Sequence, residues 1–456
     1  MIKEKYDVVI IGAGLTGLTA AFYLHKKGKK VAVIEQNNRI GGQIETFKEE
    51  GFTFEKGPNT GVVSYPEVAE LFQDLAPLCQ LETAKEESKR RLIWKGSQFH
   101  EIPSSMLGGL LTPLFSFTDK FRILGEPFRQ KGTDPDESVA NLTRRRLGKS
   151  FLNYAVDPFL SGVYAGNPET LITRFALPKL YNLEQNYGSF IKGAMAKAKI
   201  PKSDRDKLAS KKVFSAKGGL NEIPKAIEKK IGSEFIFIGA KNTQIQPQGN
   251  LWITQFNTSD NSFEFTSQEV ITTTGGYALP QILPFIECSD MNKIANLHYA
   301  PVVQVSVGVK DTEGLKFNAF GGLVPSCENR NVLGILYPSA CFEGRAPREG
   351  ALFSFFIGGV KHVELTEISD EELKKLVIKD FHDMLKFPSN KQPDLIHIFR
   401  HKHAIPQYEL NSGERFKTII SLEQTFKGLH IAGNVKGGIG MADRIRQGVE
   451  VARSIS

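Results

Sequence analysis

The chain has 456 residues, of which 41% are hydrophobic and 24% charged, and its formal net charge is +8. That is the composition of a globular protein with about two or three hydrophobic cores. No Lys/Arg run with interleaved aromatics indicates nucleic-acid binding, and no apolar run reaches the roughly 20 residues that span a bilayer. The positive charge suits an anionic substrate or membrane surface, although a scattered excess of surface lysine explains it equally well.

The sequence indicates neither a metal site nor an export signal. Its cysteines, Cys79, Cys288, Cys327 and Cys341, form no CxxC pair and stand at no metal-ligand spacing from a histidine. We therefore expect reduced thiols in a cytosolic protein. The first predicted strand begins within a few residues of the start, so we expect no signal or transit peptide.

The first 35 residues predict a dinucleotide-binding βαβ unit. The apolar runs 8–11 and 31–34 predict buried strands, and 16–27 predicts the helix between them. Gly12, Gly14 and Gly17 form GxGxxG, which serves respectively a tight turn, the approach of a pyrophosphate and the packing of the helix on the strand. Glu35 follows the second strand, where an acid holds a ribose hydroxyl.

The next residues favour FAD over NAD. Arg39-Ile40-Gly41-Gly42 can bring a guanidinium and bare backbone onto a diphosphate. This second clamp resembles that of the FAD-binding amine oxidase and desaturase superfamily. The segment Gly51–Thr60 is similar to the one that lies beside the flavin ring in that superfamily.

The middle of the chain predicts a helical insertion between parts that form sheets. We expect a helix at 66–81, a strand pair at 91–94 and 98–102, helices from 103 to about 199, and an exposed loop at 201–212. The apolar segment Met106–Phe117 could be core, or a surface for lipid or an apolar substrate path. The second half is richer in strands, with a helix at 369–385 capped by Ser369. Residues 214–231 predict a strand tip, a glycine pair and an amphipathic helix. Strands are then expected at 235–238, 242–245, 251–254, 269–274, 298–310, 318–325, 332–337, 351–357 and 397–399.

The C-terminal sequence predicts a strand at 429–432, a turn at Gly433, a glycine loop at 437–440 and a helix from about Ala442. A helix N-terminus behind glycines stabilises negative charge, which in a flavoprotein is that of the reduced flavin. An ordinary glycine-rich connection is the alternative.

Taken in order, these stretches resemble the oxygen-dependent protoporphyrinogen oxidase family of haem synthesis. Within the superfamily, the combination of GVYAGNP with GGLVP and LGILYPS is specific to that family. The stretches that carry the resemblance are GPNT (57–60), DPFLSGVYAGNPETL (157–171), FSAKGGL (214–220), NAFGGLVPSCENRNVLGILYPS (318–339), RAPREGALFSFFIGG (345–359) and HAIPQYELN (403–411).

The resemblance implies an α/β fold of the amine-oxidase type. It has a Rossmann-like FAD-binding domain (1–90, 213–280 and 415–456), a mixed-sheet substrate domain (281–414) and a helical membrane-docking insertion (96–205). It implies non-covalent FAD and the six-electron oxidation of protoporphyrinogen IX to protoporphyrin IX, with O2 reduced to H2O2. Coproporphyrinogen III is the alternative substrate. Another flavin amine oxidase or desaturase, or a non-catalytic FAD- and porphyrin-binding protein, is a more distant alternative.

The resemblance also implies contacts and partners. The expected location is cytoplasmic, peripheral on the inner membrane face, with ferrochelatase or another haem-pathway protein as a partner and a homodimer as a further expectation. FAD contacts are expected from Gly12, Ala13, Gly14, Leu15, Thr16, Gly17, Glu35, Gln36, Arg39, Gly42, Gln43, Gly57, Pro58, Asn59, Thr60, Asn242, Gly433, Asn434, Ile439, Gly440 and Met441. Apolar residues that would hold a flat macrocycle over the flavin, or serve as plain core, are Phe159, Gly162, Ala165, Phe320, Leu323 and Phe356.

Two departures from the family pattern bear on the ligands. Animal and plant members carry an Arg that can meet a propionate at the start of the helical part, where this chain has Leu107. Propionate binding would then rest on Arg91, Arg174, Lys179 or Lys217. Asn434 stands where the superfamily often has an acid, and its amide can still bond a ribityl hydroxyl. No residue is assigned as a catalytic base, since His401 and His403 are interpreted as surface or structural, and the flavin carries the chemistry.

Overall fold

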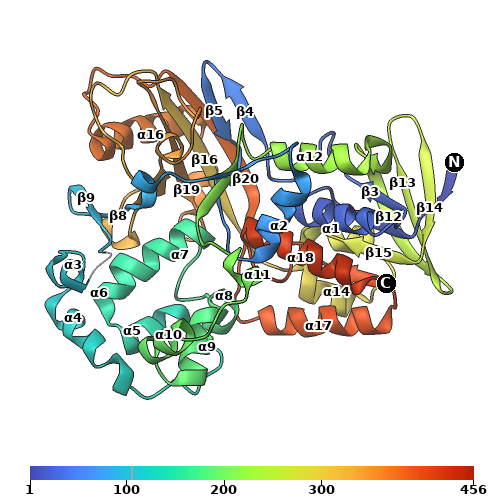
Figure 1. Ribbon diagram of the computed structural model, residues 1–456, viewed down its shortest axis with the longest axis horizontal. Coiled ribbons are helices and arrows are strands. Elements are labelled where there is room, and N and C mark those ends of the chain that lie inside the picture. The colour runs from blue at the N-terminus through green and yellow to red at the C-terminus, as the bar shows by residue number, and fades with distance from the viewer. Residues whose placement is uncertain (104–105) are drawn as a thin grey trace.

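The computed structural model describes residues 1–103 and 106–456. Its elements form three parts (Figure 1): a nucleotide-binding part around a parallel sheet, a mixed sheet backed by α16 (Asp370–Leu385), and a helical part formed by residues 106–198. The nucleotide-binding part and the helical part meet near the middle of the molecule in Figure 1, where α18 (Met441–Ser454) and α8 (Thr173–Ala176) lie.

The nucleotide-binding part is built on a five-stranded sheet in which every pairing is parallel. Its order is β11 (Ile236–Phe237), β3 (Val31–Ile34), β2 (Val8–Ile11), β15 (Glu269–Thr272) and β21 (Leu429–Ile431). Strands β2 and β3 are buried throughout, as a sheet covered on both faces requires. The predicted βαβ unit and the predicted C-terminal strand are thereby confirmed.

The first and last helices pack tightly against one another. Helix α1 (Leu15–Lys26) crosses α18, and a Cβ at Gly448 would lie 2.6 Å from the carbonyl oxygen of Thr16. A glycine at this position allows the two backbones to approach. The C-terminal helix therefore completes the same layer that the N-terminal motif begins.

The second sheet is mixed and has seven strands, in the order β20-β16-β19-β18-β17-β8-β9. Along β19 (Ala351–Gly358) the side chains of Phe353, Phe355 and Ile357 join the core beneath α16. The intervening residues belong to the opposite face, where Ser354 bonds to Asn59 of the nucleotide-binding part. This two-residue alternation divides the sheet into a core face and a face towards the site. The remaining strands are β16 (Tyr299–Val309), β20 (Leu395–Pro406), β18 (Val332–Leu336), β17 (Gly321–Leu323), β8 (Arg91–Lys95) and β9 (Gln98–Glu101).

The smaller sheets lie at the margins. A four-stranded sheet contains β1 (Ile2–Lys5), β14 (Ser262–Ser267), β13 (Leu251–Asn257) and β12 (Lys241–Gln248). A three-stranded sheet contains β6 (Gly61–Val62), β10 (Val213–Ala216) and β7 (Leu81–Thr83), and a hairpin is formed by β4 (Thr46–Glu49) and β5 (Phe52–Glu55). The nucleotide-binding part also contains α12 (Glu222–Ile231) and α14 (Cys288–Ala295), and α17 (Ser412–Thr425) packs on α14.

The helical part is organised around a buried arginine. Arg146 pairs with Glu126 at 2.6 Å and with Glu184 at 2.5 Å, and none of the three side chains is more than 1% exposed. Its helices are α3 (Met106–Leu111), α4 (Phe117–Leu124), α5 (Val139–Arg146), α6 (Lys149–Phe151), α7 (Asp157–Tyr164), α8, α9 (Pro178–Tyr187) and α10 (Phe190–Ala198), with a π-helical turn at Leu152–Val156.

Several predicted boundaries are wrong. The helix expected at 66–81 ends at Leu75 in α2 (Pro66–Leu75), because Pro77 cannot continue it, and Leu81 already belongs to β7. The expected loop at 201–212 contains the short helix α11 (Asp204–Lys207), which a Ser203 capping box stabilises. The strand expected at 318–325 is only Gly321–Leu323, whereas β20 is much longer than 397–399. The expected domain boundary at residue 96 divides the β8–β9 hairpin, which belongs to the seven-stranded sheet.

Candidate active site

The glycines of the first loop have separate structural roles. Gly12 has a φ of +103°, and a Cβ at Gly17 would lie 2.0 Å from the carbonyl oxygen of Gly12. The fold itself therefore requires glycine at both positions. Gly14 differs, because its φ is −75° and a Cβ there would meet no atom within 4 Å. Gly14 borders open space on the side where a ligand would lie.

The second glycine loop lies directly on the first. The amide of Gly41 donates to the carbonyl of Ala13 at 2.8 Å, and a Cβ at Gly42 would lie 3.0 Å from Cα of Gly14. The guanidinium of Arg39 donates to three carbonyl oxygens of this loop, those of Ile40, Gly42 and Ile44. It also pairs with Glu45 at 3.1 Å. Arg39 thus fixes the shape of the loop, and its contact with a diphosphate stays a prediction.

Glu35 is held at the tip of β3 in contact with the first loop. One carboxylate oxygen accepts from the amide of Ala13 at 2.8 Å, and the other accepts from the amide and side chain of Asn37 at 2.9 and 2.7 Å. The oxygen that accepts from Ala13 keeps a lone pair for a ribose hydroxyl, whereas both lone pairs of the other oxygen are used by Asn37. The predicted adenine-side residue, Asn242, is exposed with a φ of +53° near the start of β12, and Gln36 is exposed beside Glu35.

The N-terminus of α1 has properties that suit an anion. Its first turn contains no acidic residue, and no side chain caps it. The hydroxyl of Thr16 is buried and has no hydrogen-bond partner within the described chain. Free amides at a helix N-terminus favour a phosphate. Together with the open space over Gly14, these groups fit the diphosphate of a dinucleotide.

The C-terminal turn closes the nucleotide site against the first loop. The hydroxyl of Thr273 donates to the carbonyls of Ile11 and Gly12, each at 3.0 Å. Gly433, with a φ of +88°, packs on the same threonine, since a Cβ there would lie 2.6 Å from the Thr273 carbonyl oxygen. The carboxyl ends of β2, β15 and β21 therefore meet, which is where ligands bind in open α/β sheets.

The predicted flavin-ring segment contacts both sheets. Asn59 is buried; its Oδ1 accepts from the hydroxyl of Ser354 at 2.9 Å, and its Nδ2 donates to the carbonyl of Gly57 at 3.0 Å. A Cβ at the neighbouring Gly61 would lie 3.0 Å from the terminal methyl group of Met441. The structure thus brings the segment 57–60 and the start of α18 together, although they are far apart in sequence. Gln43 completes the group by donating to the carbonyls of His403 and Ala404 at 3.2 and 3.3 Å.

Two residues that shape the C-terminal loop were not predicted. Arg444, whose pKa is lowered by burial, donates to the carbonyls of Lys436 and Gly438 at 2.9 and 2.8 Å. Tyr299 donates its hydroxyl to Oδ1 of Asn434 at 3.0 Å. The amide of Gly440 donates to Asp443, so α18 is capped by its own side chain where α1 is not. Asn434 lies 135 residues further along the chain, in the loop after β21, so sequence spacing gives no signal for Tyr299.

Most of the predicted pocket residues lie on α7 and on the face of the seven-stranded sheet that is turned towards the nucleotide site. On α7, Phe159 is 42% exposed and Val163 40% exposed. Between them Gly162 lies against Leu323, since a Cβ there would be 2.4 Å from a Leu323 methyl group. Phe356 on β19 packs at the edge of a small cluster that includes Ala165. These apolar groups come from one helix and two strands, and they suit a flat apolar ligand.

The predicted propionate-binding residues differ in their surroundings. Arg174 pairs with Asp136 at 2.5 Å, and Lys179 lies 5.1 Å over the ring of Tyr65. Lys217 is exposed beside a glycine turn. Arg91 lies 5.4 Å over the ring of Phe320 and forms no ion pair within the described residues. Of these four, only Arg91 contacts a residue of the predicted pocket; the side chain of Leu107 lies outside those that the structure describes.

The two histidines of β20 are half-buried. His403 stacks on Tyr277 with ring centroids 4.1 Å apart, and burial lowers its pKa. His401 is largely buried on β20, and its Nε2 has no partner among the described residues. Burial, with a contribution from Lys56, lowers the His401 pKa, so the ring is neutral near pH 7. Both histidines therefore have structural positions.

Among the residues that the structure describes, no group of three or more His, Cys, Asp or Glu side chains could hold a metal ion. No helix of residues 1–103 or 106–456 has the length and apolar character to cross a bilayer. The cysteines are free thiols, with Cys79 and Cys341 buried.

A dinucleotide site at the carboxyl ends of parallel strands, facing a mixed sheet with an apolar inner face, defines an FAD-dependent oxidoreductase of two-sheet architecture. The sequence model described as flavin containing amine oxidoreductase matches residues 15–456, and the chain belongs to that family. FAD is its cofactor, and the open space over Gly14, the uncapped α1 and the orphaned Thr16 hydroxyl fit the diphosphate of that group.

Individual relatives match nearly the whole chain. Protoporphyrinogen oxidase 2 of Arabidopsis thaliana is 27% identical, over 98% of this chain and 92% of the relative. Coproporphyrinogen III oxidase of Bacillus subtilis (strain 168) is 25% identical, over 98% of this chain and 97% of the relative. The crystal structure of a protein designated a protoporphyrinogen oxidase in Exiguobacterium sp. 255-15 superimposes with a TM-score of 0.80 at 20% identity, covering 100% of this chain and 99% of that one. The last match shows the shared fold.

Proposed function

We propose that the protein is an FAD-dependent oxidase of haem biosynthesis that converts a porphyrinogen to a porphyrin in a six-electron oxidation. Protoporphyrinogen IX is the favoured substrate, and coproporphyrinogen III is the alternative. The observation that carries the proposal is the placement of Phe159, Leu323 and Phe356 on one apolar face that includes Arg91 over Phe320. The match of the whole chain to relatives with these two names supports it.

FAD, which the two glycine loops and Glu35 would hold, would supply the redox chemistry of hydride acceptance and of electron transfer to O2. The chain's own residues bind and orient the substrate. Phe159 and Val163 on α7, with Phe356 on β19, offer an apolar surface that excludes water from a flat macrocycle. Arg91 can form a bidentate ion pair with a propionate at the edge of that surface. No described side chain is assigned the role of proton acceptor.

The proposed oxidation is tested by mixing the yellow holoprotein anaerobically with each porphyrinogen and recording the visible flavin absorbance. We expect bleaching by at least one of them, followed by recovery and H2O2 release when O2 is admitted. The substrate that bleaches the flavin at lower concentration is the preferred one. If neither porphyrinogen bleaches a flavin that dithionite reduces normally, the oxidase function is wrong.

The role of Arg91 has a matched control in the neighbouring residue, Arg90, which precedes β8. Arg91→Met should raise KM by roughly 10- to 100-fold, because a charge-assisted pair with the propionate is lost, while kcat and FAD content change little. Arg90→Met serves as the control, because Arg90 pairs with Glu101 at 2.8 Å. An equal rise of KM in both variants would show that general charge, and not a propionate contact, is responsible.

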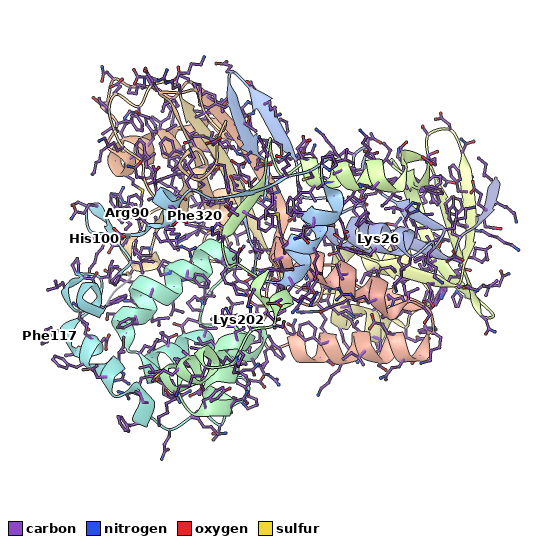
Figure 2. All side chains as sticks on the ribbon, viewed as in Figure 1. Lys26, Arg90, His100, Phe117, Lys202 and Phe320 are labelled. Carbon is purple, nitrogen blue, oxygen red and sulfur yellow. The ribbon has the colours of Figure 1, made fainter. Side chains whose placement is uncertain are left out.

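We further propose that the helical part docks on a membrane surface, as a peripheral protein of the inner face. Large apolar side chains are exposed along α4 and just after it: Phe117 (72%), Phe121 (58%), Leu124 (63%) and Phe128 (86%). Figure 2 shows Phe117 at the outer edge of the helical part, directed away from the rest of the molecule. Such a patch favours lipid or protein contact. A ferrochelatase or other haem-pathway partner and a homodimer stay predictions.

Vesicle sedimentation tests the docking proposal. Phe117→Ser and Phe128→Ser together should weaken binding to anionic vesicles by at least about 100-fold, since each buried aromatic contributes about 1.5–3 kcal/mol. Ile420→Ser, at a side chain 53% exposed on α17, is the control and should leave binding unchanged. Equal binding by the double variant and the wild type would contradict the proposal.

A further inference from the structure

One of the arginines in the interior of the protein lacks an acidic partner. Among the residues that the structure describes, Arg146, Arg345 and Arg415 are each at most 3% exposed. Arg146 lies between two buried glutamates, and Arg345 pairs with Glu55 at 3.1 Å. Arg415 is 0% exposed and forms no ion pair with any residue of 1–103 or 106–456. Since a charge removed from water without a counter-charge is costly, Arg415 differs from the other two.

The guanidinium of Arg415 is held by neutral groups. Its Nε donates to the carbonyl of Val435 at 3.0 Å, and its Nη2 donates to the hydroxyl of Ser412 at 3.2 Å. Its Nη1 is buried and has no acceptor within the described chain. The rings of Phe416 and Tyr408 lie 5.0 and 5.8 Å from its central carbon. Burial lowers the pKa of Arg415, but an arginine stays charged near pH 7.

Glu409 is the carboxylate whose field acts on Arg415. The Glu409 side chain is 26% exposed, and its Oε2 lies 3.4 Å from Nδ1 of His298. Water screens a partly exposed charge more than it screens a buried one. Glu409 therefore offsets only part of the positive potential around Arg415.

A second arginine, on α18, adds to this potential. The Nη2 of Arg444 donates to the carbonyls of Lys436 and Gly438 at 2.9 and 2.8 Å. Its Nε is shielded from solvent and has no acceptor among the described residues. The carboxylate of Asp443 offsets part of the charge of Arg444, but it accepts from the backbone amide at the start of α18. Three carbonyls of the loop between β21 and α18 are thus bound by two guanidinium groups.

This loop also borders the nucleotide site. Gly433 packs against Thr273, whose hydroxyl donates to the carbonyl of Gly12 at 3.0 Å. Asn434 and Ile439–Met441 are the residues expected beside the ribityl chain and ring of FAD. Two cations, one of them fully buried, therefore stand behind the loop that is expected to contact the flavin.

We propose that Arg415, together with Arg444, stabilises the negative charge that FAD acquires on reduction. A hydride adds two electrons and one proton at N5, and the surplus negative charge then resides at N1 and O2. A buried cation acts through a low dielectric, so it favours this anion without touching it. Both arginines also bind carbonyls of the loop, so they are positioning residues. The proposal rests on FAD as the cofactor and not on the identity of the substrate.

Reduction of the holoprotein by dithionite, with a redox dye of known potential as reference, tests the proposal without porphyrinogen. Arg415→Met should lower the equilibrium constant for two-electron reduction at least about 10-fold, which is a fall of about 30 mV for each tenfold. Arg444→Gln should lower it several-fold. Arg415→Lys keeps the charge and should stay within about threefold of the wild type. Lys417→Gln removes an exposed charge from the same helix and is the matched control, with a change of less than about twofold.

Proton uptake gives a second readout. The pH above which reduction takes up one proton instead of two is the pKa of N1 in the reduced flavin. A tenfold loss of stabilisation of the anion in Arg415→Met should raise this pKa by about one unit. A change that only loosens FAD leaves the pKa as it is in the wild type.

An equilibrium constant within about twofold of the wild type in Arg415→Met and Arg444→Gln would overturn the proposal. So would an equal fall in Lys417→Gln, or a fall in Arg415→Lys as large as in Arg415→Met, because shape and not charge would then be responsible. The flavin-to-protein ratio and thermal unfolding check that each variant is folded. If Arg415→Met does not fold, Arg444→Gln and Arg415→Lys decide by the same criteria. Because the readout is the reduction of FAD by dithionite, failure here leaves the proposed oxidase function unaffected.

Discussion

Gly14→Val is expected to abolish FAD retention and to leave the apoprotein folded. The backbone at Gly14 has φ −75° and ψ 177°, an extended conformation that a β-branched residue adopts readily. No protein atom lies within 4 Å of the position of a new Cβ, so the valine side chain meets only the space in which a ligand lies. Loss of glycine at such a position stabilises a fold by about 0.4–1 kcal/mol, through the entropy of the unfolded chain.

The magnitude of the cofactor effect follows from what the side chain displaces. Gly14 lies against Gly42, whose Cβ would be 3.0 Å from Cα of Gly14, so the diphosphate cannot move aside without leaving the N-terminus of α1. Loss of two charge-assisted hydrogen bonds at about 1.5–3 kcal/mol each weakens FAD binding by roughly two to four orders of magnitude. Gly14→Ala should show a smaller effect of the same sign.

The assay is the molar ratio of flavin to protein after gel filtration, together with urea unfolding of the apoproteins. Gly17→Ala is the contrasting variant: its Cβ would lie 2.0 Å from the Gly12 carbonyl oxygen, so it should lose stability as well as FAD. Stoichiometric FAD in Gly14→Val would refute the assignment of this loop to the diphosphate. An apoprotein of Gly14→Val as unstable as Gly17→Ala would show instead that Gly14 is needed for folding.

Two further predictions concern buried charges. Arg345→Met should lower the free energy of unfolding, measured by urea titration, by about 3–5 kcal/mol, because buried Glu55, 3.1 Å from the guanidinium, loses its partner. The control Arg348→Met, at an exposed site, should change that free energy by less than about 0.5 kcal/mol. Burial raises the pKa of Asp380 from its ordinary 3.8 to about 6, so its contribution to stability is full below pH 4 and is lost as pH rises towards 6. Asp380→Asn should therefore be more stable than the wild type by about 1–3 kcal/mol at pH 7.5 and about equal at pH 4. A gain of the same size at both pH values would contradict the titration of this carboxyl, and Asp383→Asn is the more exposed control.

The elements that the sequence predicted best are those whose boundaries are set by local chemistry. Strands β2 and β3 match their apolar runs residue for residue, and β16 matches within one residue at each end. The poorly predicted elements are half-buried or edge strands. The strand β20 alternates polar and apolar residues at the edge of its sheet, and β14 was missed altogether. Such strands are specified by their neighbours more than by their own composition.

The site shows the same division. The glycines and Glu35 were predicted because a diphosphate and a ribose demand particular residues at fixed local spacings. Arg444 and Tyr299 were missed, because what each holds in place becomes apparent only when β16, β21 and α18 are brought together. Arg39 illustrates a further limit: the sequence places it beside the second glycine loop, and the structure shows its guanidinium bound to the carbonyls of that loop.

The sequence by itself determined the cofactor class, because GxGxxG, the acid after the second strand and the second glycine pair are local devices for one ligand. Only the tertiary structure decided how the site closes. Thr273 bonds to Gly12, 261 residues earlier in the chain, and packs against Gly433 in the turn after the last strand. Only the assembled sheet determines which side chains of β19 face the site and which face the core. These contacts depend on the order of parallel strands, which is set by long-range packing and not by the local pattern of any one segment.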